Sequence, residues 1–260
     1  MNIVYASVVV IAGLSVGSFL NVLIFRMPRN KPFAMERSIC PHCSEKLRWY
    51  HNIPLVSYLL LGGKCSFCKA KISLRYPLVE AANALLYLYF FWQLGLQPSF
   101  FIYAYLSSAL LTIFFIDLDF QIIPDLLTLP GIAIGLAVSL LPDGIGIVQS
   151  AIGFLVGGGS LYLMAVLGEW LFKKEAMGGG DIKMCAMLGA FLGWQKVLFV
   201  FLAAAGIGLI VSIIMMVISA KLRETRMIPF GPFLATAAMV AILYGDKLIA
   251  LYIDNFINIR

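Results

Sequence analysis

Eight long apolar runs, separated by short breaks, constrain this chain more than any other feature of its sequence. The runs cover about residues 3–25, 78–96, 99–116, 126–142, 147–171, 183–194, 197–220 and 231–252. A helix needs roughly 20 apolar residues to cross a bilayer, and runs this continuous lack the alternation of a transmembrane barrel. With 62% hydrophobic and 12% charged residues, the chain is also more apolar than a soluble domain. We therefore predict an all-α, polytopic membrane protein with about eight transmembrane helices.

The placement of lysine and arginine predicts how these helices are oriented. Ten of the 19 basic residues fall in the polar segment 26–76, and segments 172–183 and 221–226 hold three each. Because cytoplasmic loops are rich in lysine and arginine, we assign these segments to the cytoplasm and the N-terminus to the other side. The net charge of +6 then reflects membrane topology, so we expect contact with membrane lipid and no nucleic-acid partner. The oligomeric state stays open.

The same pattern divides the chain into three segments. Residues 1–25 form a first transmembrane helix, residues 26–76 a cytoplasmic cysteine loop, and residues 77–260 a transmembrane core. No basic residue precedes the first apolar run, which is the wrong order for a cleaved signal peptide. We therefore expect the first run to remain as a membrane helix.

Four cysteines in the cysteine loop have the spacing of a metal site. Cys40 and Cys43 form one CxxC pair, and Cys65 and Cys68 form a second pair after 21 intervening residues. Two such pairs can supply four thiolates to one tetrahedral zinc ion, and a reducing cytoplasm disfavours disulfides. A metal would also stabilise a loop with so small an apolar core. The spacing predicts a structural zinc site; four reduced thiols held by other contacts is the alternative.

Two aspartates lie at the ends of apolar runs, where a charge is costly. Asp117 ends the run LLTIFFIDLDF, and Asp181 follows three glycines in MGGGDIKMC. Ionisable groups at membrane depth are functional candidates by default, and two adjacent carboxylates share protons because both cannot ionise easily. The predicted topology puts both at the cytoplasmic face, where they could meet. Such a pair is suited to activating water.

Other roles for these acids stay open at this point. Asp119 and Asp125 compete with Asp117, although Asp119 points to nearly the opposite side of a helix and Asp125 is placed to cap the next helix. Asp181 could itself be an N-cap residue. Its glycine lead-in nevertheless leaves backbone free to lie close to another extended chain. Lys183 is either a topology determinant or a charge that screens the pair.

Several motifs together resemble the type IV prepilin peptidase family of intramembrane aspartyl proteases. They are GSFLNVLIFRMP (17–28), the two CxxC pairs, NIPLVSYLLLGGKC (52–65), RYPLVE (75–80), IDLDFQIIPD (116–125), GGGDIKMCAMLGAFLGW (178–194) and IPFGPFLA (228–235). A lone GxGD is a weak signal, but this order along nearly the whole chain is specific. The resemblance places the catalytic pair on Asp117 and Asp181.

The resemblance also implies an activity, substrates and a cofactor. The enzyme would cut the leader from type IV prepilins or type II secretion pseudopilins at the cytoplasmic face of the bacterial inner membrane. It would then methylate the new N-terminus with S-adenosylmethionine. No Rossmann-type glycine fingerprint is present, so the methyl-donor site is not identified; Glu80, an acid within an apolar run, is one candidate and otherwise a structural partner of Arg75 or Asn83. A zinc-binding transporter or scaffold, with the aspartates relaying cations or protons, is the alternative function.

Overall fold

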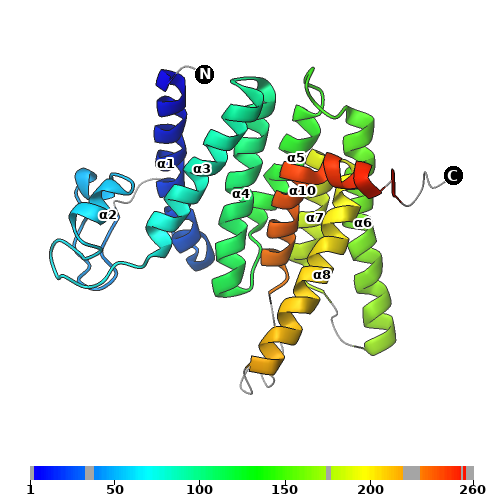
Figure 1. Cartoon of the computed structure of the whole chain (residues 1–260). Helices are drawn as coiled ribbons and strands as arrows, with labels where there is room; N and C mark the ends of the chain where they lie inside the picture. The colour runs from blue at the N-terminus through cyan, green and yellow to red at the C-terminus, as the bar shows by residue number, and fades with distance from the viewer. Residues whose placement is uncertain (1–2, 33–37, 174–176, 219–228, 253, 256–260) are drawn as a thin grey trace. The chain divides into compact units, whose positions relative to one another are not determined.

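Each of the eight predicted apolar runs is a helix in the computed structural model, which describes residues 3–32, 38–173, 177–218, 229–252 and 254–255 (Figure 1). The helices are α1 (Ile3–Arg26), α3 (Arg75–Leu94), α4 (Pro98–Phe120), α5 (Asp125–Val138), α6 (Ile147–Phe172), α7 (Gly179–Leu192), α8 (Trp194–Ile218) and α10 (Gly231–Tyr252). Short helices η1 (Met27–Arg29), η2 (Trp49–Asn52) and α2 (Val56–Leu60) lie between α1 and α3. The prediction of an all-helical fold is confirmed.

Four of the described helices, α1, α4, α6 and α8, are long and apolar enough to cross a membrane. Two shorter apolar helices accompany them, namely α5 and the first part of α10, Gly231–Gly245. Helix α7 has 14 residues, fewer than a full span requires. The protein is therefore a multi-pass membrane protein in which short helices complement full-length ones.

The chain forms two compact units, Met1–Thr112 and Ile113–Arg260, and helix α4 contributes residues to both. In the first unit α1 packs along α3, because Gly13 and Gly17 allow the two backbones to approach closely. A methyl group on Gly17 would lie 2.7 Å from the Cα of Glu80. Asn83 secures the contact: its Nδ2 donates to the Gly13 carbonyl at 2.8 Å, and its Oδ1 accepts from Ser108 at 2.8 Å.

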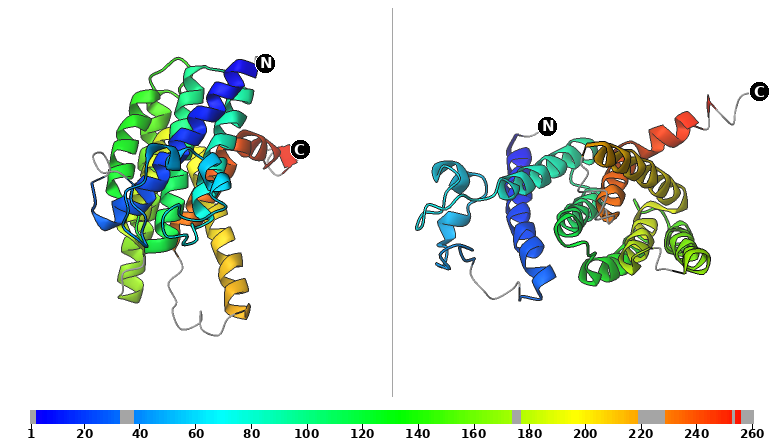
Figure 2. Two further views of the ribbon diagram at one scale, coloured as in Figure 1. Left: turned by 90° about the vertical axis from the view of Figure 1, so that its left-hand side faces the viewer. Right: turned by 90° about the horizontal axis from the view of Figure 1, so that it is seen from below.

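Helix α7 forms the centre of the second unit, in contact with α5, α6, α8 and α10 (Figure 1 and, from two further directions, Figure 2). Every residue from Met184 to Leu192 is buried. Small residues make the closest contact, since Gly153 of α6 and Gly189 of α7 meet backbone to backbone. Helices this close are typical of membrane proteins that use small residues at helix interfaces. The burial of α7 explains how so short an apolar helix is accommodated.

Candidate active site and metal centre

Asp117 is buried near the C-terminal end of α4, with 5% of its surface exposed. Its Oδ2 accepts a hydrogen bond from the backbone N–H of Gly231 at 2.9 Å. Gly231 is the first residue of α10, and the first amides of a helix have no acceptor within that helix. The carboxylate therefore satisfies an otherwise unpaired amide and is fixed by it. A methyl group at Gly231 would lie 2.6 Å from Asp117 Oδ2, so the carboxylate could keep this position only beside a residue without a side chain.

Asp181 lies in the first turn of α7 and is partly exposed. The N-cap of α7 is Gly178, so Asp181 is not the N-cap residue that the sequence also allowed. Its backbone N–H donates to the Gly178 carbonyl at 3.2 Å. A carboxylate in the first turn is favoured by the partial positive charge at a helix N-terminus.

Asp117 and Asp181 lie near one another, on two helices of the second unit. Ile123 lies between Gly180, which precedes Asp181, and Gly231, which binds Asp117. A methyl group on Gly180 would lie 2.9 Å from Ile123 Cβ, and one on Gly231 would lie 3.2 Å from Ile123 Cδ1. The two carboxyl groups are close enough for the charge on Asp117 to act on Asp181.

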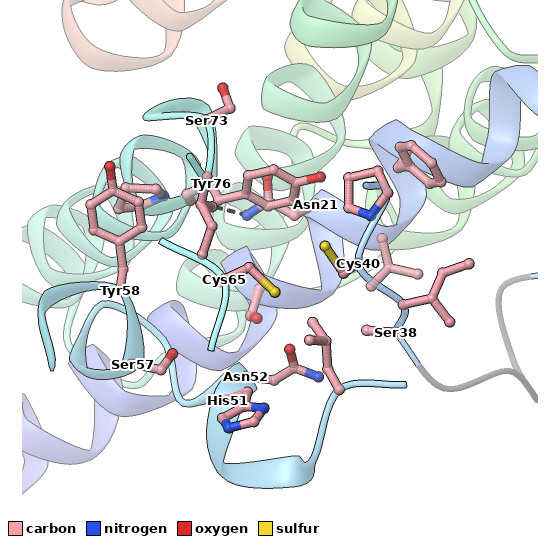
Figure 3. Close-up of a pocket in the computed structure, with 18 of the residues that line it drawn as sticks. Asn21, Ser38, Cys40, His51, Asn52, Ser57, Tyr58, Cys65, Ser73 and Tyr76 are labelled. Carbon is pink, nitrogen blue, oxygen red and sulfur yellow. Dashed lines mark hydrogen bonds between the residues drawn. The ribbon is translucent and has the colours of Figure 1, made fainter. Parts of the chain in front are cut away.

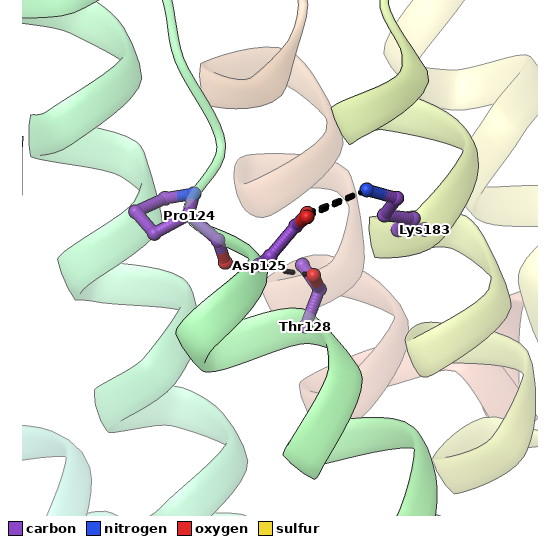
Figure 4. A network of polar contacts seen from close by, with 4 residues as sticks. All are labelled: Pro124, Asp125, Thr128 and Lys183. Carbon is purple, nitrogen blue, oxygen red and sulfur yellow. Dashed lines mark hydrogen bonds and ion pairs between the residues drawn. The ribbon is translucent and has the colours of Figure 1, made fainter.

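The competing acids occupy different positions. Asp119 is exposed, on the side of α4 away from buried Asp117. Asp125 begins α5, but the expected capping role is wrong: Pro124 is the N-cap residue and no side-chain capping bond forms. Instead, both oxygens of Asp125 accept from Lys183 Nζ at 2.7 Å (Figure 4). An ammonium is a stronger hydrogen-bond donor to a carboxylate than a backbone amide. The bond from Lys183 ties the start of α5 to the start of α7.

The two CxxC segments of the cysteine loop have the same local structure. In each, the first cysteine N–H bonds a carbonyl five residues on, at 2.9 Å for Cys40 to Glu45 and 2.8 Å for Cys65 to Ala70. The residue after each second cysteine, Ser44 or Lys69, has a φ near +60°. Short antiparallel bridges flank both turns, Ile39 with Lys46 and Lys64 with Lys71. The loop is thus built from two equivalent turns, each presenting two thiols.

The four thiols converge on one point. The sulfur atoms of Cys40, Cys43, Cys65 and Cys68 all lie within 4.8 Å of one another, and those of Cys40 and Cys68 are 3.9 Å apart. Sulfurs bound to one tetrahedral zinc lie about 3.8 Å apart. The donor set and its spacing fit a zinc ion, and the cluster can bind a metal.

Glu80 lies in the first unit, on the second turn of α3, and is 8% exposed. Its Oε2 accepts the backbone N–H of Leu55 at 2.9 Å, and Ser18 of α1 donates a further hydrogen bond. The sequence offered Asn83 as a structural partner, but the Asn83 side chain bonds Gly13 and Ser108. Glu80 instead holds the cysteine loop against α1 and α3.

The sequence did not identify Gly231 or Ile123 as parts of the site. Gly231 lies within the quoted motif IPFGPFLA, where a Gly-Pro pair at a predicted helix start was the available signal. Ile123 carries no local signal, because its role comes only from packing between two glycines distant in sequence.

Comparisons with known proteins cover almost the whole chain. Residues 11–94 match the bacterial peptidase A24 N-terminal domain, and residues 104–213 match the type IV leader peptidase family. The prepilin leader peptidase/N-methyltransferase of Pseudomonas aeruginosa is 38% identical, over 94% of this chain and 92% of its own. Proteins of the same name from Aeromonas hydrophila and Legionella pneumophila are 37% and 34% identical, over 97% and 95% of this chain and 95% and 93% of theirs. No solved structure matches.

Proposed function

The chain belongs to the prepilin leader peptidase/N-methyltransferase family, and on that premise we propose that Asp117 and Asp181 cut the leader from a type IV prepilin or a type II secretion pseudopilin. The carrying observation is the proximity of two carboxyl groups from α4 and α7, one of them fixed by the Gly231 amide. The family assignment does not favour the alternative of a transporter or scaffold. The distribution of basic segments along the chain supports a site at the cytoplasmic face of the bacterial inner membrane.

The chemistry follows from one proton shared between two carboxyl groups. The ionised carboxylate takes a proton from a water molecule, whose oxygen then attacks the scissile carbonyl carbon. The protonated carboxyl group donates a hydrogen bond to the carbonyl oxygen, where negative charge develops. As the C–N bond breaks, the leaving nitrogen receives a proton from the pair. The products are a free leader carboxylate and a new N-terminal amine.

The backbone around Asp181 suits an extended substrate. Gly178 and Gly179 are exposed, and a methyl group on Gly179 would meet no atom within 4 Å. A peptide can therefore approach this backbone without steric exclusion and pair with it, as extended peptides commonly do. Gly178 lies beside the carboxylate itself, since a methyl group there would be 3.2 Å from Asp181 Oδ2.

Asparagine substitutions test the catalytic assignment. Asp117→Asn and Asp181→Asn keep the side-chain size but cannot exchange the proton, so each should abolish cleavage of a purified prepilin while membrane insertion is retained. Asp119→Asn is the matched control and should cleave at the normal rate, because its carboxyl group is on the exposed side of α4. Full cleavage by Asp117→Asn or Asp181→Asn would move the site to Asp119 or Asp125.

We assign two further features to the same function. After cleavage, the new N-terminal amine is methylated, with S-adenosylmethionine as the donor. Zinc held by Cys40, Cys43, Cys65 and Cys68 has a structural role: it joins the two equivalent turns of the cysteine loop and supplies no chemistry to peptide cleavage.

A further inference from the structure

A cavity of about 660 Å³ lies in the first unit, between α1, the start of α3 and the cysteine loop (Figure 3). Its volume is in the range of sites that bind small molecules and cofactors. Its walls combine segments that are far apart in sequence, from Ser15 on α1 to Glu80 on α3. All of the described lining residues belong to the first unit, so the aspartate pair, in the second unit, is not part of it.

Two polar atoms in the cavity wall have no partner within the described part of the chain. Asn21, 5% exposed, donates through Nδ2 to the Tyr76 carbonyl at 3.0 Å, which fixes the side chain, yet its Oδ1 accepts nothing (Figure 3). The buried Oγ of Ser66 is also without a partner. Buried polar groups in native proteins are nearly always hydrogen-bonded. These two atoms are therefore available to a polar ligand, and Asn21 Oδ1 can only accept a hydrogen bond from it.

Charge is distributed unevenly around the same cavity. Glu80 is the sole acidic residue among the described lining residues, and it is nine-tenths buried. Leu55, whose N–H binds Glu80, has φ 58° and ψ −47°, a strained conformation for a residue with a branched side chain. Basic and aromatic groups also line the cavity, among them Arg26, Lys31, Lys71, Phe25, Tyr58 and Tyr76.

We propose that this cavity is the site of the methyl donor, S-adenosylmethionine, with Glu80 as the counter-charge to the donor's cationic half. The inference rests on the proposed function. The donor has a planar base for the aromatic rings, a carboxylate for the basic groups, and N–H and O–H groups for Asn21 and Ser66. It also carries a sulfonium and an ammonium, which a buried carboxylate stabilises.

The transfer itself requires only the donor and the new amine. The amine lone pair forms a C–N bond with the methyl carbon, while the electron pair of the C–S bond returns to sulfur. The sulfonium becomes a neutral thioether, S-adenosylhomocysteine, and the proton released from nitrogen passes to water. Because Cys40 and Cys65 also line the cavity, the metal centre supports the wall of the donor site.

Equilibrium binding of labelled S-adenosylmethionine and S-adenosylhomocysteine to the full chain in detergent tests this site. Glu80→Gln should weaken binding of the sulfonium donor at least tenfold and binding of the neutral thioether less, because only the donor carries the extra positive charge. Ser57→Trp places an indole in the cavity and should abolish binding of both. Val56→Trp is its matched control, since Val56 is 49% exposed and lies outside the cavity wall. Glu169→Gln, an exposed acid on α6, is the charge control.

The outcomes separate this proposal from the proposed peptidase site. Prepilin cleavage by the Glu80→Gln and Ser57→Trp variants should persist and shows that they are folded. The double variant Asp117→Asn, Asp181→Asn should bind the donor normally although it does not cleave. Donor binding that survives both Glu80→Gln and Ser57→Trp, or equal losses in the control variants, would overturn the cavity assignment and leave the aspartate assignment intact.

Discussion

The backbone amide of Gly231 donates to the carboxylate of Asp117 across 114 residues of sequence, at 2.9 Å. This single bond links the end of α4 to the start of α10 and sets the position of a buried acid. A side chain at position 231 would displace the carboxylate, because it would occupy the same space. The geometry of the aspartate pair therefore depends on a helix that contributes no acid to it.

Gly231→Ala should reduce prepilin cleavage by about 100-fold, since a misplacement of roughly 1 Å can cost that much in rate. The added methyl group would lie 2.6 Å from Asp117 Oδ2 and must displace it. Cleavage kinetics measure the effect. Gly206→Ala on α8 is the control, because a methyl group there meets nothing within 4 Å. Equal rates for the two variants would show that Gly231 does not position Asp117.

The Asp125–Lys183 ion pair should contribute little to stability. The two side chains are 54% and 40% exposed, and exposed pairs are worth about 0–1 kcal/mol. The melting temperature of Lys183→Met should therefore fall by only a few degrees below that of the wild type. This difference should shrink in high salt. Asp125→Asn should retain prepilin cleavage, because Asp125 bonds Lys183 in this structure. A cleavage-dead Asp125→Asn variant that is folded would make this acid part of the reaction.

Gly153→Ala should destabilise the second unit by about 1–3 kcal/mol, the usual effect of overpacking a close contact. A methyl group at Gly153 would clash with the Gly189 carbonyl oxygen of α7 and would lie 2.8 Å from the Cα of Gly193. Gly159→Ala, on the same helix, is the matched control because a methyl group there meets nothing within 4 Å. Unfolding in detergent compares the free energies of unfolding of the two variants. If Gly153→Ala were as stable as Gly159→Ala, the close α6–α7 contact would be contradicted.

Freshly purified protein should contain about one zinc per chain. Cys68→Ser should lose it, because a hydroxyl group is a poor ligand in a site built for four thiolates. Cys185→Ala should keep it, since Cys185 is buried in α7 of the second unit. Elemental analysis of unchelated protein gives the result. Metal-free wild-type protein, or full zinc content in Cys68→Ser, would contradict a four-cysteine site.

The helix positions and the four-cysteine cluster could be predicted, because both depend on patterns within short segments of sequence. Apolar runs form helices in lipid whatever their neighbours, since every backbone group must be satisfied within the segment. The CxxC pairs likewise define their own turns, as the repeated bonds at Cys40 and Cys65 show.

Other features required the packed chain. The sequence left Asp119 and Asp125 as alternatives to Asp117, and only packing buries Asp117, exposes Asp119 and pairs Asp125 with Lys183. The Gly231 amide, the Ile123 spacer and the Glu80 contact with Leu55 join residues distant in sequence.

The sequence by itself determined the helices and pointed to the four cysteines and the acids, because hydrophobicity, residue spacing and charge are properties of short segments. The tertiary structure alone decided which carboxyl groups meet and which polar atoms face a cavity. Those relationships arise because glycines let helices approach closely. The sequence around a glycine does not show which distant residue packs against it.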